Sequence, residues 1–249
     1  MAEPTQTIEG WYALHDFRTI NWSAWKAATK TEREEALQEL QTYNATYRSF
    51  DQKRTSGFGV YTIAGHKADL LFVHFRPTLH DLIDSETELD KTKFAAFLTK
   101  PYSYISIVEL SSYLSKPDVS PEEDPQLLPR LRPELLKMMN NICFYPMNKR
   151  RSGEDNWYML NMEQRVQLMR SHGMIGRKYT GKVTQIITGS IGLDDWEWGV
   201  TLYANDPLEF KKLVYEMRFD EVSARYAEFG AFYVGYAVND EALSTLLHV

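Results

Sequence analysis

The order of strand-like and helix-like segments occurs twice in this chain. The first half reads β-α-β-β-α-β from its apolar periodicity, and the second half reads in the same order. Each such unit is the pattern of a ferredoxin-like domain, in which helices cover one face of a four-stranded sheet. Because the other face must also be buried, we predict an α+β fold of two ferredoxin-like domains packed sheet to sheet as an α/β barrel, of the dimeric α+β barrel type. We expect a ligand on the inner surface of one sheet.

The first half contains alternating or β-branched segments that predict strands, and apolar residues at helical spacing that predict helices. A capping box of Thr31 and Glu34 predicts the start of the first helix, and Ser85 with Glu88 predicts the start of the second. The expected strands are 10–17, 57–63, 68–75 and 102–110, and the expected helices are 32–47 and 86–98.

The second half shows the same signals. Asn161 is the predicted cap of its first helix and Gly173 the residue just beyond that helix. Asp206 and Pro207 predict the start of its second helix. The expected strands are 141–147, 182–189, 195–203 and 231–238, and the expected helices are 162–171 and 207–219.

A stretch rich in proline and acidic residues separates the two halves. This composition is typical of a linker. We therefore expect an N-terminal ferredoxin-like domain at 1–114, a linker at 115–135 and a C-terminal ferredoxin-like domain at 136–249.

Composition and charge exclude several classes of protein. With one cysteine, Cys143, the chain cannot form an intramolecular disulfide, which excludes a secreted disulfide scaffold. The first residues lack the regions of a signal peptide, and no apolar run approaches the roughly 18 residues that span a bilayer. We expect a cytoplasmic protein with no transmembrane segment. A net charge of −6 and a pI of about 5.6 argue against nucleic-acid binding.

The charge is unevenly distributed. The window 149–182 holds eight basic and three acidic residues, a net of +5 in an acidic chain. This pattern indicates either an anionic ligand or a solvated basic face. Aromatic residues make up 13 % of the chain, which fits either a β-rich core or a site for a flat ligand.

Three residues of the strand at 141–147 and its continuation form the first candidate site. In extended chain, Tyr145, Met147 and Lys149 share one face. Pro146 cannot donate a ladder hydrogen bond, so it predicts an edge or an opening toward a ligand. Lysine is rarely buried without a partner, so this face is either a ligand site or a strand end running into solvent.

His172 and Gln185 are further candidates. His172 lies at the predicted end of a helix, where it is either stabilised by the helix dipole or the single axial ligand of a haem iron. A lone histidine does not make a structural zinc site. Gln185 shares an apolar strand face, where its amide needs either a polar partner or a ligand. Cys143 is interpreted as a buried core thiol, because its strand is apolar and no histidine is near in sequence.

Six segments of the second half resemble coproheme decarboxylases of Gram-positive bacteria, a family of the chlorite dismutase superfamily. They are 143–151 (CFYPMNKRR), 156–160 (NWYML), 172–179 (HGMIGRKY), 185–190 (QIITGS), 194–202 (DDWEWGVTL) and 215–221 (YEMRFDE). The likeness extends over nearly the whole chain. The YPMNKRR run is specific to the decarboxylases, and chlorite dismutases are expected to carry arginine where Gln185 stands.

This resemblance implies a homopentamer whose C-terminal domains bind Fe-coproporphyrin III. It implies that hydrogen peroxide drives oxidative decarboxylation of two propionates to vinyls, giving protohaem b in haem biosynthesis, with ferrochelatase as a possible transient partner. By the resemblance, His172 is the axial iron ligand, Tyr145 carries the radical, and Lys149 acts beside the reacting propionate. The remaining binding residues that it implies are Pro146, Met147, Asn148, Gln185, Arg218, Ser223 and Arg130, with Arg132 competing for the role of Arg130.

Two other functions stay open from the residues alone. One is a haem-binding or haem-transfer protein without catalysis, which His172 and the basic window also fit. The other is a chlorite dismutase-like peroxidase, which Gln185 disfavours. The products separate them, because only the decarboxylase removes two carboxylates from its porphyrin.

Overall fold

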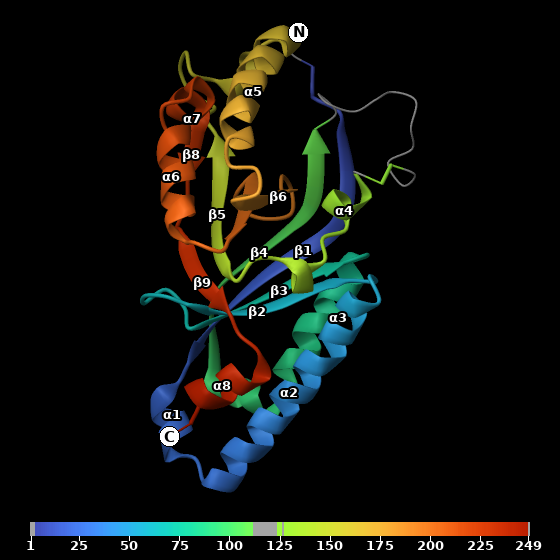
Figure 1. Cartoon of the computed structure of the whole chain (residues 1–249), viewed down its shortest axis with the longest axis vertical. Helices are drawn as coiled ribbons and strands as arrows, with labels where there is room; N and C mark the ends of the chain where they lie inside the picture. Colours follow the sequence, from blue (N-terminus) through green and yellow to red (C-terminus); the bar gives the residue numbers. More distant parts are fainter. Residues whose placement is uncertain (1–2, 112–123, 126, 249) are drawn as a thin grey trace. The chain divides into compact units, whose positions relative to one another are not determined.

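The computed structural model of the chain describes residues 3–111, 124, 125 and 127–248 (Figure 1). It is an α+β structure with antiparallel strands, and the predicted fold of two ferredoxin-like domains is confirmed. Two compact units are present in it. We call them the N-terminal unit (10–105, 132–138 and 233–249) and the C-terminal unit (1–9, 106–131 and 139–232), as far as these ranges are described. The expected domain boundaries at 114 and 136 stay a prediction.

The N-terminal unit holds the first β-α-β-β-α-β series. Its strands are β2 (Gly57–Ile63), β3 (Leu70–Arg76), β9 (Tyr233–Ala237) and most of β1 (Thr7–Ile20) and β4 (Leu98–Ser111). Residues 7–9 of β1 and 106–111 of β4 belong to the C-terminal unit. Its helices are α1 (Trp22–Ala27), α2 (Lys30–Gln52), α3 (Leu79–Asp90), α8 (Asp240–Leu246) and the short 3-10 segments η1 (Lys93–Phe97) and η3 (Leu135–Lys137). Strands β1, β3, β2 and β9 pair in that order, all antiparallel.

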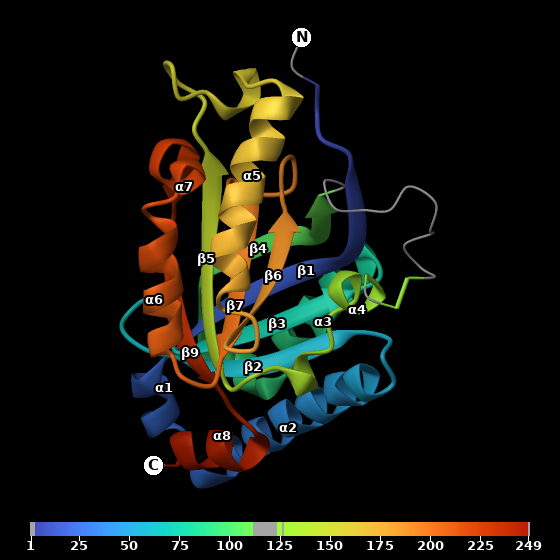
Figure 2. The same ribbon diagram turned by 45° about the horizontal axis from the view of Figure 1, so that its top comes forward.

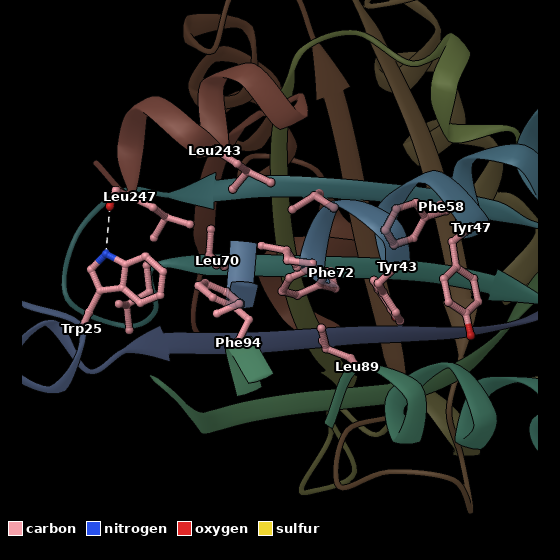
Figure 3. Packing of buried hydrophobic residues seen from close by; sticks show 14 residues of the cluster. Trp25, Tyr43, Tyr47, Phe58, Leu70, Phe72, Leu89, Phe94, Leu243 and Leu247 are labelled. Carbon is pink, nitrogen blue, oxygen red and sulfur yellow. Dashed lines mark hydrogen bonds between the residues drawn. The ribbon is translucent and has the colours of Figure 1, made fainter. Parts of the chain in front are cut away.

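The core of this unit forms between its long helices and the face of β2 and β3 (Figure 3). Phe58 and Phe72 of these strands pack with Leu40 and Tyr43 of α2. Trp25 closes one end of the cluster, where its indole N–H donates to the carbonyl of Leu247 at 2.8 Å.

Helix α2 begins two residues before the predicted start. Thr29, not Thr31, is its N-cap, and the side chain of Thr29 accepts from the backbone N–H of Glu32. The Glu32 carboxylate bonds in return to the N–H of Thr29, so Glu32, not Glu34, completes the capping box. Two overlapping threonine–glutamate pairs carry the same local signal, and the pair whose threonine is extended forms the cap.

Helix α3 also begins earlier than predicted. The predicted capping pair, Ser85 and Glu88, lies inside the helix, where the Ser85 hydroxyl donates to the carbonyl of Asp81. The observed capping box joins Thr78 and Asp81. Aspartate fills the position that glutamate or glutamine usually holds in this motif, which is why the sequence pattern pointed to the later pair.

The C-terminal unit holds the second series. Its strands are β5 (Asn141–Lys149), β6 (Val183–Gly189), β7 (Trp198–Ala204) and β8 (Ala227–Phe229). Its helices are α4 (Leu128–Leu131), η4 (Trp157–Met159), α5 (Met162–Arg177), α6 (Leu208–Met217) and α7 (Glu221–Tyr226). The end of β4 pairs with β6, and β6, β7, β5 and β8 follow in that order, all antiparallel.

Two predictions for this half are wrong in detail. Asn161 caps α5 as expected, but Gly173 lies within the helix, which continues to Arg177, so His172 is not at the helix end. The strand expected at 231–238 is present as β9, but it pairs with β2 and not with a strand of this half, and the short β8 just before it, which was not expected, pairs with β5. Helix α7 was not expected at all, because its six residues are too few to show a periodicity.

Residues 115–123 and 126 of the predicted linker at 115–135 lie outside the described residues; its described part contains α4. No helix among the residues that the structure describes has the length and apolar character needed to cross a membrane.

The core of the N-terminal unit yields a stability prediction. Leu40→Ala should lower the free energy of unfolding by about 2–5 kcal/mol, because Leu40 is fully buried and its loss leaves a cavity. Ile83→Ala on α3, where the side chain is 51 % exposed, should change it by no more than about 0.5 kcal/mol. Urea unfolding followed by circular dichroism measures both, and equal losses would contradict the core assignment.

Candidate functional site

The register of three strands brings the predicted residues to one face of the sheet. Across β7, Tyr145 of β5 lies opposite Val200, and Gln185 of β6 lies opposite Leu202. Directly opposed residues point to the same face, and alternate residues of a strand share it. Tyr145, Met147, Lys149 and Gln185 therefore lie on one face of the C-terminal unit.

Helices cover this face. Tyr145 and Val200 pack in one apolar cluster with Phe210 and Leu213 of α6 and with Tyr179, which follows α5. Figures 1 and 2 both show α5 and α6 alongside β5. The expectation of a ligand on the inner sheet surface is therefore not met by these residues, because the register turns them toward the helices.

His172 projects from α5 with one nitrogen held and the other free to bind. Its Nδ1 lies 2.7 Å from Oδ2 of Asp220, the N-cap residue of α7. A carboxylate accepts only, so Nδ1 carries the proton and Nε2 presents a lone pair. Burial lowers the pKa of His172 and the charge of Lys149 adds to this, while Asp220 opposes it. A neutral imidazole whose second nitrogen donates to a carboxylate is the arrangement of a metal-ligating histidine.

Lys149 ends β5 in a half-buried position. Its Nζ lies 4.6 Å from the centre of the Trp157 ring, a cation–π contact. In the described part of the chain, no carboxylate lies within salt-bridge distance of this ammonium group. Burial lowers the pKa of Lys149 to about 8, against the opposing charges of Asp220 and Glu197. The group is therefore poised to gain from an anionic ligand.

Tyr145 is buried, with 8 % of its surface exposed. Its ring stacks on Phe232 with centroids 4.4 Å apart and lies 5.8 Å from the ring of Phe229. Burial raises the pKa of Tyr145 well above its usual value, against the opposing charge of Arg218. The side chain is therefore a neutral phenol at physiological pH.

Arg218 borders the same aromatic group, and Ser223 lies in the helix that follows it. The Arg218 guanidinium lies 3.6 Å from the centre of the Phe229 ring, and the residue is exposed. Ser223 is buried in α7, the helix that Asp220 caps. Arg218 directly follows α6, and Ser223 lies in α7. These two helices therefore supply a cation and a hydroxyl group near the site.

The other predicted residues of β5 have separate positions. Pro146 faces Gly199 of β7, away from Tyr145, and its carbonyl accepts from the N–H of Gly230 at 2.8 Å. Met147 packs at the border of the apolar cluster. The Asn148 side chain accepts from the backbone N–H of Glu197 at 2.9 Å, so its contact is with the chain itself.

Gln185 is exposed although its strand neighbours are largely buried. This excludes the interpretation as a buried polar pair and leaves the amide available to a ligand. Arg130 on α4 is exposed, and within the described ranges no hydrogen bond or ion pair joins its side chain to another predicted residue, while Arg132 belongs to the N-terminal unit. Cys143 is a buried free thiol, as predicted.

Three residues of the site were missed from the sequence: Asp220, Glu197 and Trp157. Each touches a predicted residue from 8 to 49 positions away in the chain. No local pattern marks such pairs. In the described residues no group of three or more His, Cys, Asp or Glu side chains could hold a metal ion.

Comparison with known proteins adds family evidence. The sequence profile of chlorite dismutase matches residues 33–238. A structure described as a novel haem-binding protein from Thermus thermophilus is 49 % identical, with a TM-score of 0.95 over 100 % of this chain and 99 % of that one. Chlorite dismutase from Candidatus Nitrospira defluvii in complex with imidazole is 19 % identical, with a TM-score of 0.74 over 96 % of each chain, which shows a shared fold.

The buried ammonium group yields a prediction for the ligand-free protein. Lys149→Met should raise the free energy of unfolding at pH 7 by about 2–3 kcal/mol, because the folded-state pKa of Lys149 of about 8 lies below the usual 10.5. Between pH 8 and 10.5 Lys149 binds more protons in the unfolded chain than in the folded one, so the wild type gains stability as the pH rises. The difference in the free energy of unfolding between wild type and variant therefore disappears toward pH 10.5. Urea unfolding from pH 7 to 10.5 measures it; a difference that is independent of pH would contradict the assignment.

Proposed function

Because the profile of chlorite dismutases covers most of its length, the chain belongs to the chlorite dismutase family, and we propose that it is a coproheme decarboxylase. In this proposal it uses hydrogen peroxide to convert two propionates of Fe-coproporphyrin III to vinyls, giving protohaem b. One observation carries the proposal: a neutral buried tyrosine and a lysine without a carboxylate partner share the sheet face that His172 approaches.

The residues of the C-terminal unit fit an iron porphyrin. His172 offers one neutral nitrogen, the axial donor that such an iron needs. The aromatic side chains around Tyr145 offer a flat apolar wall. Lys149 and Arg218 supply positive charge for propionates. Haem binding by the Thermus relative supports this assignment.

The reaction balances with one peroxide for each propionate. A propionate side chain, one H₂O₂ and one proton give a vinyl group, CO₂ and two waters. The side chain loses two electrons and one C–H hydrogen while peroxide is reduced. When bound, the iron porphyrin activates the peroxide as oxidant, and the protein supplies position and protons.

Tyr145 is proposed to relay the oxidation. Its phenol gives up one electron and one proton together, and the resulting oxygen radical takes a hydrogen atom from the propionate carbon beside the ring. The carbon radical then loses a second electron to the peroxide-derived oxidant and releases CO₂, which leaves the vinyl group. The high pKa of Tyr145 keeps the hydrogen in place until then. Stacking on Phe232 holds the ring, and such transfer depends steeply on position.

Lys149 is proposed to bind the reacting propionate and to supply the proton that the reaction consumes. Burial deprives the ammonium group of hydration, and a propionate carboxylate beside it would compensate for this loss. The pKa of Lys149 would then rise toward its usual value. Arg218 and Ser223 are proposed to bind further propionates, together with Arg130 or its competitor Arg132. Pro146, Met147 and Asn148 shape the strand beside them, and the exposed amide of Gln185 would be available to the bound group.

Further parts of the proposal rest on the sequence resemblance alone. We propose a cytoplasmic homopentamer that acts in haem biosynthesis and meets ferrochelatase transiently. The products test the function directly: mass spectrometry after peroxide addition to the Fe-coproporphyrin III complex should show loss of two carboxyl groups. An unchanged porphyrin would favour a haem-binding or transfer protein, and oxygen release from chlorite would favour a chlorite dismutase-like peroxidase.

Tyr145→Phe tests the role of the phenolic hydroxyl, because it removes only that group. The ring, its stacking on Phe232 and its volume remain, so Fe-coproporphyrin III should still bind, but turnover should fall by at least about a hundredfold, because phenylalanine cannot be oxidised in its place. Absorbance titration measures binding and mass spectrometry measures protohaem b. Tyr179→Phe, which removes a phenolic hydroxyl of the same apolar cluster that donates to Glu216, is the matched control and should keep most activity. Normal protohaem b production by Tyr145→Phe would refute the relay.

His172→Ala isolates the axial nitrogen. The variant should bind Fe-coproporphyrin III about tenfold or more weakly, since the iron loses its protein ligand, while metal-free coproporphyrin III should bind as before. Resonance Raman should lose the iron–histidine vibration, and added imidazole should restore it. The exposed His80 gives the control variant His80→Ala. An unchanged vibration in His172→Ala would exclude His172 as the ligand.

A further inference from the structure

The ladder between β5 and β7 ends just before Lys149. Its last pair is Met147 opposite Trp198. One position further along the strands, hydrogen bonds between side chains and backbone take the place of backbone-to-backbone hydrogen bonds. The Asn148 side chain accepts from the N–H of Glu197 at 2.9 Å, and the Glu197 carboxylate accepts from the N–H of Lys149 at 2.7 Å. These two hydrogen bonds form a reciprocal clasp that extends the junction of the two strands.

Glu197 has little freedom within this clasp. Only 7 % of its surface is exposed, and its own carbonyl accepts from the N–H of Ser190 at 2.8 Å. The second carboxylate oxygen lies 3.7 Å from Nε of Arg151. One hydrogen bond and one ion-pair contact therefore restrict the orientation of this buried carboxylate. The clasp therefore fixes the backbone from which the Lys149 side chain departs.

The clasp also places a negative charge near the ammonium group. Three charged or titratable groups act on Lys149: Glu197 before β7, Asp220 at the start of α7 and His172 on α5. Asp220 is hydrogen bonded to His172, and Glu197 to the Lys149 backbone. Neither carboxylate reaches Nζ, so both favour the charged lysine without occupying its donors.

We propose that Glu197 is a positioning residue for Lys149, which it holds through the strand backbone so that the ammonium group selects porphyrins with a carboxylate at that place. This inference deepens the proposed function and rests on it. Glu197 does not touch the substrate; it acts through Lys149. Its loss should reduce the preference for Fe-coproporphyrin III over protohaem b, which has two carboxylates fewer.

The first measurement needs no ligand. Amide hydrogen exchange at Lys149 in the ligand-free protein should become about tenfold faster in Glu197→Ala, since one buried hydrogen bond is lost. Glu197→Gln keeps an acceptor oxygen and should keep most of the protection. Glu228→Ala is the matched control, because Glu228 lies on β8 opposite Asn148 but directs its carboxylate to Arg150. Unchanged exchange in Glu197→Ala would overturn the proposal.

The second measurement tests selection. Absorbance titrations with Fe-coproporphyrin III and with protohaem b should show their affinity ratio falling about tenfold in Glu197→Ala, with partial rescue in Glu197→Gln and no change in Glu228→Ala. Equal weakening of both ligands would show a merely structural role and overturn the proposal. If Glu197→Ala does not fold, Asn148→Ala opens the other half of the clasp and must show the same ratio change. Failure of the proposed function would appear separately, as wild-type protein that forms no protohaem b.

Discussion

The pairing of β5 and β6 with β7 is the constraint on which the candidate site depends. It aligns Tyr145 with Val200 and Gln185 with Leu202, so side chains 40 residues apart in sequence share one face. A slip of one residue in either ladder would turn one of them to the opposite face. The apolar cluster favours this register, because Tyr145 is buried in it together with Val200 and Leu202.

Electrostatics then distinguish this face from an ordinary core. Two carboxylates lie near one ammonium group and one imidazole, and both already accept a hydrogen bond. Asp220 accepts from His172, and Glu197 accepts from the Lys149 backbone. The ammonium group thus remains charged near neutral pH without an ion pair of its own. A buried ammonium group without an ion pair lowers the stability of the ligand-free chain, and an anionic ligand beside it would restore that stability. The arrangement is consistent with a site built for the carboxylates of a porphyrin.

Much of the fold was predictable, because it follows from local periodicity. The repeated β-α-β-β-α-β order, strand β2 and the Asn161 cap were all visible in the sequence. The errors lie where two local signals compete or where a segment is short. Overlapping capping pairs misplaced the start of α2, and a later serine–glutamate pair misplaced the start of α3. Gly173 falsely predicted a helix end, and α7 is too short for a pattern.

The sequence by itself determined the residue types of the site: a tyrosine and a lysine at alternate positions of one strand, a histidine on a helix, and a basic window around both. Only the tertiary structure decided which face they occupy and which groups hold them. Asp220, Glu197 and Trp157 reach their partners through folding, and β9 pairs with β2 although it is far from it in sequence. Side-chain hydrogen bonds and strand pairing join residues at separations that no periodicity encodes, so they appear only once the chain is folded.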